Sequence, residues 1–281
     1  MNSIERAQQR LARLSRAGVS IGVGTALARR SDFQIQAPQR QVSIDRARLR
    51  EFAGPWVKGS TPRAEEAAQA FLAIGAALMG NAYHQRTLGS SQAELRSTVA
   101  VVSARQGDGK TYCAWHVAHA LLQHQAESVL LVDACGGAGS LTQRLGLPTD
   151  QGGLPALLGG QQDNWSQVVL GTDWPGLQVV PMPNIAERIE GQPTVAQWQQ
   201  FLEQWVGQHH NRWVVLDMAA LLPMPYSMVP LSSVDQTVMV ARSGQPLSEV
   251  QRAAKMLQGC PVVLGVLNQV DRPSAQVVRA G

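Results

Sequence analysis

The sequence of 281 residues lacks any apolar run long enough to span a membrane, and its first residues lack the apolar core of a secretory signal, so we expect neither. Cysteine is scarce, and Cys113, Cys135 and Cys260 are scattered and odd in number. This pattern argues against a disulfide framework and indicates a reduced, cytoplasmic compartment. Only three lysines occur among 24 basic residues, and one of them, Lys110, follows a glycine-rich stretch.

Charge is distributed unevenly along the chain. Residues 1–63 hold 12 Lys and Arg against 4 Asp and Glu, a net of +8, whereas residues 64–281 carry a net of −4. Such a basic segment suits acidic lipid headgroups, an acidic partner or nucleic acid, or is a solvated tail. Within it, residues 4–16 have the spacing of a short amphipathic helix, and residues 17–42 lack a period and predict a linker.

The rest of the chain alternates between helical and strand-like runs. Helices are predicted over 43–53, 62–84, 110–124, 140–145, 153–158, 195–209 and 247–258. Strands are predicted over 98–104, 128–134, 177–182, 213–218, 236–241 and 262–269. The helix over 62–84 is apolar enough to be buried or packed on a partner. Because most of the strands are continuously apolar, we predict an α/β fold with a parallel sheet and helices on both faces.

Residues 103–111 read Ser-Ala-Arg-Gln-Gly-Asp-Gly-Lys-Thr, between a predicted strand and a predicted helix. A strand, a glycine loop, a Lys-Thr pair and a helix form the context of a phosphate-binding loop. Glycines let the backbone curl so that successive N–H groups face a triphosphate, and the helix N-terminus adds its positive dipole end. Lys110 would reach the phosphates and the Thr111 hydroxyl would bind Mg²⁺, although Ala104 occupies the position where the pattern has its first glycine.

Two carboxylates follow apolar strands downstream of the loop. Asp133 ends the run 128–133, and Asp217 ends the run 213–217. Ligands of α/β folds bind at the carboxyl ends of parallel strands, which is where a Mg²⁺ ligand or its supporting carboxylate is needed. We therefore interpret both as part of the nucleotide site, with a strand-end turn residue as the alternative for each.

These motifs resemble the bacterial tyrosine kinases of exopolysaccharide synthesis, within the MinD/ParA class of P-loop ATPases. The match is closest to the tyrosine autokinase-like proteins associated with exosortase and chain-length-determinant loci. It extends over nearly the whole chain and includes residues 153–159, 238–244 and 264–268. The resemblance implies a P-loop ATPase domain over 61–281, preceded by a helical and partly disordered basic extension over 1–60.

The resemblance also implies roles for particular residues. ATP would be held by Gln106, Gly107, Asp108, Gly109, Lys110, Thr111, Tyr112 and Asn268. Mg²⁺ would be bound by Thr111, Asp133 and Asp217, and the catalytic residues would be Lys110 and Asp133. Asn268 falls where relatives bind adenine, and a simple turn residue is the equally weighted alternative.

The chain departs from this family at several positions. Cys135 replaces the second carboxylate of the motif that begins at Asp133, and residues 69–76 are apolar where relatives carry charged contacts that join protomers. The three tyrosines, Tyr83, Tyr112 and Tyr226, form no C-terminal cluster for autophosphorylation. Two hypotheses therefore stay open: an ATP-binding enzyme with weak catalysis, or a catalytically degenerate binding module that scaffolds polysaccharide machinery.

Expected partners and location follow from the resemblance. It implies a cytoplasmic protein, peripheral at the inner face of the plasma membrane, with an integral-membrane chain-length-determinant protein as partner. A homo-oligomer is also allowed, and no nucleic acid is expected. His116, His119 and His124 are interpreted as helix-packing residues rather than as a metal site, and Cys113 as a small buried hydrophobe.

Overall fold

The computed structural model places the described residues in one compact unit, Ile35–Gly281. The described residues are 37–44, 62–88, 97–150, 152–159, 165–183, 193–206, 211–222, 231–269 and 278–279. The helix predicted over 4–16 lies outside them. So does the helix predicted over 43–53, apart from its first two residues.

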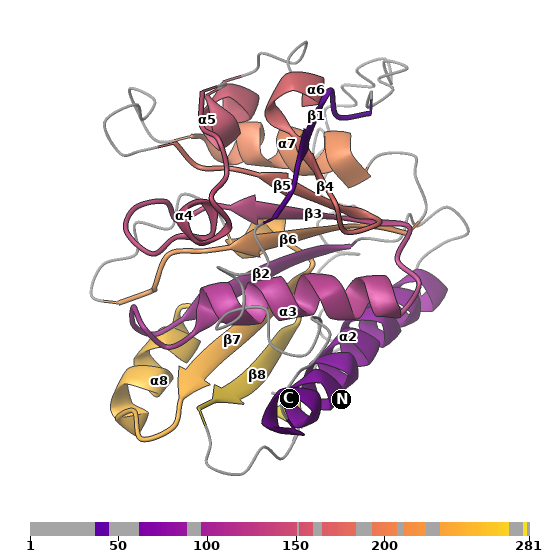
Figure 1. Ribbon diagram of the computed structural model, residues 1–281. Helices are drawn as coiled ribbons and strands as arrows, with labels where there is room; N and C mark the ends of the chain where they lie inside the picture. Colours follow the sequence, from indigo (N-terminus) through magenta and orange to yellow (C-terminus); the bar gives the residue numbers. More distant parts are fainter. Residues whose placement is uncertain are drawn as a thin grey trace, which may run out of the picture. The chain divides into compact units, whose positions relative to one another are not determined.

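A single sheet organises this unit, in the order β1-β4-β5-β3-β6-β2-β7-β8-β9 (Figure 1). The strands are β1 (Arg40–Val42), β2 (Thr98–Ser103), β3 (Ser128–Asp133), β4 (Leu170–Thr172), β5 (Leu177–Val180), β6 (Arg212–Asp217), β7 (Gln236–Arg242), β8 (Val263–Asn268) and β9 (Val278–Arg279). Neighbours from β5 through β8 all pair in parallel, and antiparallel pairs occur where β4 meets β5 and β9 meets β8. The six predicted strands and the predicted α/β class are confirmed.

The helices follow the predicted alternation. They are α2 (Pro62–Leu88), α3 (Lys110–Gln123), α4 (Leu141–Leu145), α5 (Gly153–Leu158), α6 (Trp165–Val168), α7 (Val195–Val206) and α8 (Leu247–Lys255), with a 3-10 turn η4 (Leu231–Ser233). Of these, α6 and η4 were not predicted, because each is a single short turn without a readable period.

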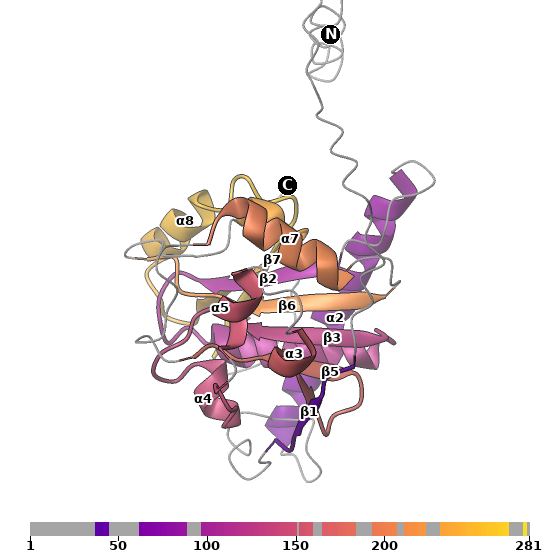
Figure 2. The ribbon, with the colours of Figure 1, turned by 90° about the horizontal axis from the view of Figure 1, so that it is seen from above.

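Both faces of the parallel sheet are covered. Every residue of β2 and β3 is buried, and because successive side chains of a strand point to opposite faces, this requires cover on both sides. On one face, Val99 and Val101 share a core cluster with residues of α2 and α3. The alternate residues Ala100 and Val102 are buried on the other face, where α7 contacts β6. Figure 2 shows β6 lying between α7 and α3.

The long helix α2 packs on the outer side of α3, so its apolar face is buried within its own domain. Phe71, Ile74 and Leu78 of this helix are buried. At Gly75 the two helices come so close that an added Cβ would lie 3.0 Å from the Cβ of Ala120. Neither α2 nor another helix in the described ranges is both long and apolar enough to cross a membrane.

The strand β1 corrects one expectation, because residues 17–42 were predicted to be a linker. Residues Arg40–Val42 instead pair in parallel with β4 at the edge of the sheet. Gln41 lies over Gly171, where an added Cβ would be 2.3 Å from the Gln41 Nε2 atom, so the missing side chain makes room for this strand. The division of the chain at residues 60 and 61 stays a prediction.

Candidate functional site

The glycine loop connects β2 to α3 at the carboxyl end of the sheet. Gly107 and Gly109 have φ angles of +89° and +99°, a backbone conformation that favours glycine. Gly109 directly precedes α3, and an added Cβ there would clash with the side-chain amide of Asn268. Lys110 begins the helix and is buried, with 7% of its surface exposed. The predicted strand, loop and helix are thus all present.

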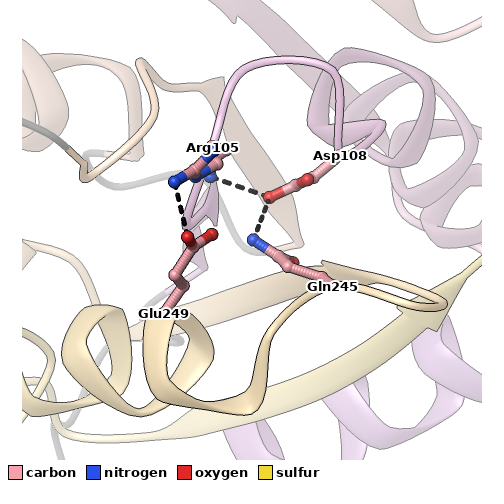
Figure 3. Close-up of polar contacts among 4 residues, drawn as sticks. All are labelled: Arg105, Asp108, Gln245 and Glu249. Atoms are coloured by element: carbon pink, nitrogen blue, oxygen red, sulfur yellow. Dashed lines mark hydrogen bonds and ion pairs between the residues drawn. The ribbon is translucent and has the colours of Figure 1, made fainter.

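Residues that follow β7 in the chain contact this loop (Figure 3). The Asp108 carboxylate accepts hydrogen bonds from the Arg105 backbone N–H at 2.8 Å and from Gln245 Nε2 at 3.2 Å. The Asp108 carbonyl accepts one from Asn268 Nδ2 at 2.9 Å. The Arg105 guanidinium pairs with Glu249 in the first turn of α8. The sequence reasoning missed Gln245 and Glu249, for which the only available signal was their position just after the apolar strand β7.

Asp133 lies at the end of β3, and both of its carboxylate oxygens are engaged. Oδ1 accepts from the backbone N–H groups of Cys135 at 3.1 Å and Gly136 at 2.8 Å. Oδ2 accepts from the backbone N–H of Thr142 at 2.9 Å and from its hydroxyl at 2.6 Å. These four bonds join the loop after β3 to the start of α4. The roles of Asp133 as a catalytic residue and Mg²⁺ ligand stay predictions, beside this structural role.

Asp217 lies opposite Asp133 in the parallel register of β3 and β6 and is fully buried. Within the described ranges, neither of its carboxylate oxygens has a partner with regular hydrogen-bond geometry. Burial, followed by the negative charge of Asp133, raises the pKa of the Asp217 carboxyl from 3.8 to about 7. The Thr111 hydroxyl and the charges of Lys110 and Arg144 act in the opposite direction on this pKa.

The arrangement of Lys110, Thr111 and Asp217 fits a magnesium–nucleotide complex. Buried polar groups in native proteins normally have partners, so an unsatisfied carboxylate beside a lysine and a hydroxyl suggests a cation within reach. Mg²⁺ takes oxygen ligands and typically retains waters and substrate phosphates in its shell. Among the described residues, no group of three or more His, Cys, Asp or Glu side chains could hold a metal ion. Phosphate and water would therefore have to complete the coordination.

The remaining predicted site residues lie at different distances from this centre. Asn268 ends β8 and reaches the loop through its bond to Asp108, and its adenine-binding role stays a prediction. Tyr112 is half-buried, and its ring lies 4.1 Å from the ring of His116 and 5.8 Å from that of Phe71 in α2. Its side chain therefore takes part in the contact between α2 and α3, and its role in nucleotide binding stays a prediction.

The histidines of α3 are packing residues, as predicted. His116 stacks on Phe71 with ring centroids 4.6 Å apart. His119 Nδ1 hydrogen-bonds the Trp115 carbonyl at 2.9 Å, and burial lowers the pKa of His119 to about 4. Cys113 is buried, and burial together with the charge of Asp217 raises the pKa of its thiol to about 12. This thiol is therefore neutral and unreactive at physiological pH, as its interpretation as a small hydrophobe requires.

Comparisons with known proteins agree with this geometry. A protein-family model described as "Cellulose biosynthesis protein BcsQ" matches residues 96–258, which is more than half of the chain. No protein with a curated description matches the sequence.

Three solved structures show the breadth of the fold. The chimerical protein CapA2B2 is 17% identical, with a TM-score of 0.53 over 84% of this chain and 96% of that chain. The kinase domain of VpsO is 18% identical, with a TM-score of 0.50 over 70% and 97%. The MinD cell division protein of Aquifex aeolicus is 16% identical, with a TM-score of 0.50 over 62% and 70%. The predicted MinD/ParA-like P-loop NTPase fold, shared with kinase domains of this class, is confirmed.

Proposed function

The chain belongs to the cellulose biosynthesis protein BcsQ family, and on that premise we propose that it binds ATP and Mg²⁺ at the loop between β2 and α3. We further propose that it acts in, or regulates, the synthesis or export of a bacterial exopolysaccharide. The observation that carries the nucleotide proposal is the buried Lys110 at the start of α3, close to the unsatisfied carboxylate of Asp217.

The residues of the loop account for phosphate binding in this proposal. The N–H groups at the start of α3 would donate to phosphate oxygens, and the helix dipole would add to the attraction. Lys110 would contribute a charge-assisted hydrogen bond to the β- and γ-phosphates. Thr111 and Asp217 would hold Mg²⁺, which when bound neutralises charge on the phosphates. Gln245 and Asn268 would keep the loop in its curled form through Asp108.

A second candidate function, a catalytically degenerate binding module, is favoured by the surroundings of Asp133. Cys135 stands where the resembled kinases have a second carboxylate, and a thiol supplies neither a hard oxygen ligand nor a carboxylate base. Asp133 itself has both oxygens engaged in holding its own loop. We therefore propose that catalysis is weak, and that nucleotide binding is the property common to both candidates.

The cellular setting is proposed on other grounds. The family description concerns cellulose, a polysaccharide, which supports a role in exopolysaccharide synthesis. The net charge of +8 over residues 1–63 suits acidic lipid headgroups and supports a peripheral place at the inner face of the plasma membrane. An integral-membrane chain-length-determinant protein is the proposed partner, a homo-oligomer is allowed, and nucleic acid is not a proposed ligand.

Calorimetric titration with MgATP tests the nucleotide proposal. Lys110→Ala should weaken binding at least about tenfold, because a charge-assisted contact to the phosphates is lost. Lys255→Ala at the end of α8 removes an exposed lysine outside the loop and serves as the matched control. Absence of MgATP binding by the unaltered protein, or equal binding by Lys110→Ala, would refute the proposal.

Phosphate release from MgATP separates the two candidates. If the thiol limits catalysis, Cys135→Asp should raise the rate about 10²-fold, because one general base is restored. Cys135→Ser controls for loss of the thiol itself. An unchanged rate in Cys135→Asp would rule out this explanation, and fast turnover by the unaltered protein would rule out the degenerate module.

A further inference from the structure

The glycine loop carries an ion pair for which the proposed phosphate-binding scheme has no role. Arg105 lies two residues after the end of β2, and its Nη2 atom pairs with Oε1 of Glu249 (Figure 3). These residues are 144 positions apart in the sequence. The Arg105 side chain is 63% exposed, whereas that of Glu249 is 15% exposed. The cation therefore reaches out of the loop towards a carboxylate that is fixed on α8.

The shape of the loop does not depend on this pair. The Asp108 carboxylate already binds the Arg105 backbone N–H and the side chain of Gln245, and the Asp108 carbonyl binds Asn268. Each of these contacts uses atoms other than the Arg105 guanidinium. The guanidinium can therefore leave Glu249 while the backbone of the loop stays in place.

Separation of the pair is also energetically accessible. A partly exposed ion pair contributes little to stability, because solvent screens it and both side chains must be ordered. Glu249 lies in the first turn of α8, where the positive end of the helix dipole stabilises a carboxylate. Its Oε2 atom is buried and has no hydrogen-bond partner among the described residues, so when Arg105 leaves, the helix dipole is the contact that continues to stabilise the carboxylate.

We propose that Glu249 is a positioning residue that holds Arg105 away from the nucleotide, so that the carboxylate and the phosphates compete for the same guanidinium. This inference rests on the proposed binding of a nucleoside triphosphate. A phosphate group carries more charge than a carboxylate and binds a guanidinium through two parallel hydrogen bonds. On binding, Arg105 turns from Glu249 to phosphate oxygens, and the first turn of α8 loses its link to the loop. Glu249 thereby lowers the affinity for nucleotide and couples α8 to the occupancy of the site.

Calorimetry with MgATP at low ionic strength tests this competition in the full chain. Glu249→Gln removes the competing charge with almost no change in shape and should bind about three- to tenfold more tightly. Arg105→Ala should bind more weakly. The double variant should match Arg105→Ala, because the carboxylate acts only through Arg105. Glu203→Gln, an exposed glutamate of α7, is the control and should bind as the unaltered protein does.

A charge exchange separates this role from a purely structural one. The variant with Arg105→Glu and Glu249→Arg restores the pair with reversed polarity, so its melting temperature should exceed that of Glu249→Arg alone, while MgATP binds more weakly than to the unaltered protein. Unaltered affinity in this variant, or equal or weaker binding by Glu249→Gln, would overturn the inference and leave the proposed function standing. Absence of MgATP binding in the unaltered protein and in all variants would overturn both.

Discussion

Asp133 and Asp217 occupy equivalent places on neighbouring strands and have opposite environments. They pair in register at the carboxyl ends of β3 and β6, and both are fully buried. Asp133 accepts two hydrogen bonds from the loop that follows its own strand and two from Thr142 at the start of α4. Asp217 has no partner of regular geometry in the described part of the chain, and the pKa of its carboxyl is raised to about 7.

The difference separates a carboxylate that serves folding from one that is available to a ligand. An ionised carboxylate is stable in the interior only where hydrogen bonds or opposite charges replace water. The segment after β3 supplies these bonds to Asp133 with three backbone N–H groups and the Thr142 hydroxyl. Among the described residues no N–H group replaces water at Asp217, and a metal cation beside Lys110 would stabilise its charged form. This is the physical basis for placing Mg²⁺ beside Asp217 in the proposal.

The largest effect is expected from removal of the satisfied carboxylate. Asp133→Ala leaves three backbone N–H groups and the Thr142 hydroxyl without their acceptor, and should destabilise the protein by about 3–5 kcal/mol. Chemical denaturation measures this loss. Asp150→Ala, which removes an exposed ion pair with Arg40, is the control and should change stability by less than about 1 kcal/mol. A small loss in Asp133→Ala would show that the four bonds contribute little.

Replacement of the unsatisfied carboxylate should stabilise the protein, whereas replacement of Asp133 destabilises it. Without Mg²⁺ and nucleotide, Asp217→Asn should be more stable than the unaltered protein at pH 8 by about 4 kcal/mol, because a buried charge is removed. The same substitution should weaken the dependence of ATP binding on Mg²⁺. Denaturation in the presence of a chelator, and titration with ATP with and without Mg²⁺, measure the two effects.

The stabilising effect of Asp217→Asn should depend on pH in a defined window. The folded-state pKa of about 7 lies above the ordinary value of 3.8, so the folded state holds this proton more tightly than the unfolded chain does. The unaltered protein therefore loses stability relative to the variant as the pH rises from about 4 to about 7, and the difference vanishes below about pH 4. A difference that stays constant across this range would show that ionisation of Asp217 is not its cause.

The smallest effect is expected at Thr142. Its hydroxyl donates to Asp133 at 2.6 Å and accepts the backbone N–H of Met182 at 2.8 Å. Thr142→Val removes both bonds but leaves the backbone bond to Asp133, and should lower the free energy of unfolding by about 1–2 kcal/mol. Thr142→Ser retains the hydroxyl and should lie closer to the unaltered protein. If the two variants are equally destabilised, the methyl group rather than the hydroxyl matters.

Much of the central fold could be predicted because its strands appear in the sequence as continuous apolar runs. The strands β2, β3 and β6 are buried almost throughout, and such runs separated by helical patterns identify a parallel sheet. The short strands β1 and β4 were not predicted, because three residues without alternation carry no readable period. Their pairing depends on Gly171, which leaves space for Gln41.

The candidate site, like the fold, could be predicted only in part. Its phosphate-binding loop has a local pattern, and Asp133 and Asp217 could be read as strand-end residues. Gln245 and Glu249 could not be identified from the sequence, since their contacts with Asp108 and Arg105 span 137 and 144 residues. Nor could the sequence distinguish the environments of the two aspartates, because hydrogen bonds to Asp133 depend on how the loop after β3 turns.

By itself the sequence determined the α/β class, the glycine loop and the replacement of a carboxylate by Cys135, because each depends on residue types that are near one another in the chain. Only the tertiary structure decided that α2 packs on its own domain, that α8 holds Arg105, and that the Asp217 oxygens have no hydrogen-bond partner of regular geometry among the described residues. The physical reason is that burial and pairing are properties of residues brought together from distant parts of the chain. Those same properties decide which polar group is satisfied and which is left for a ligand.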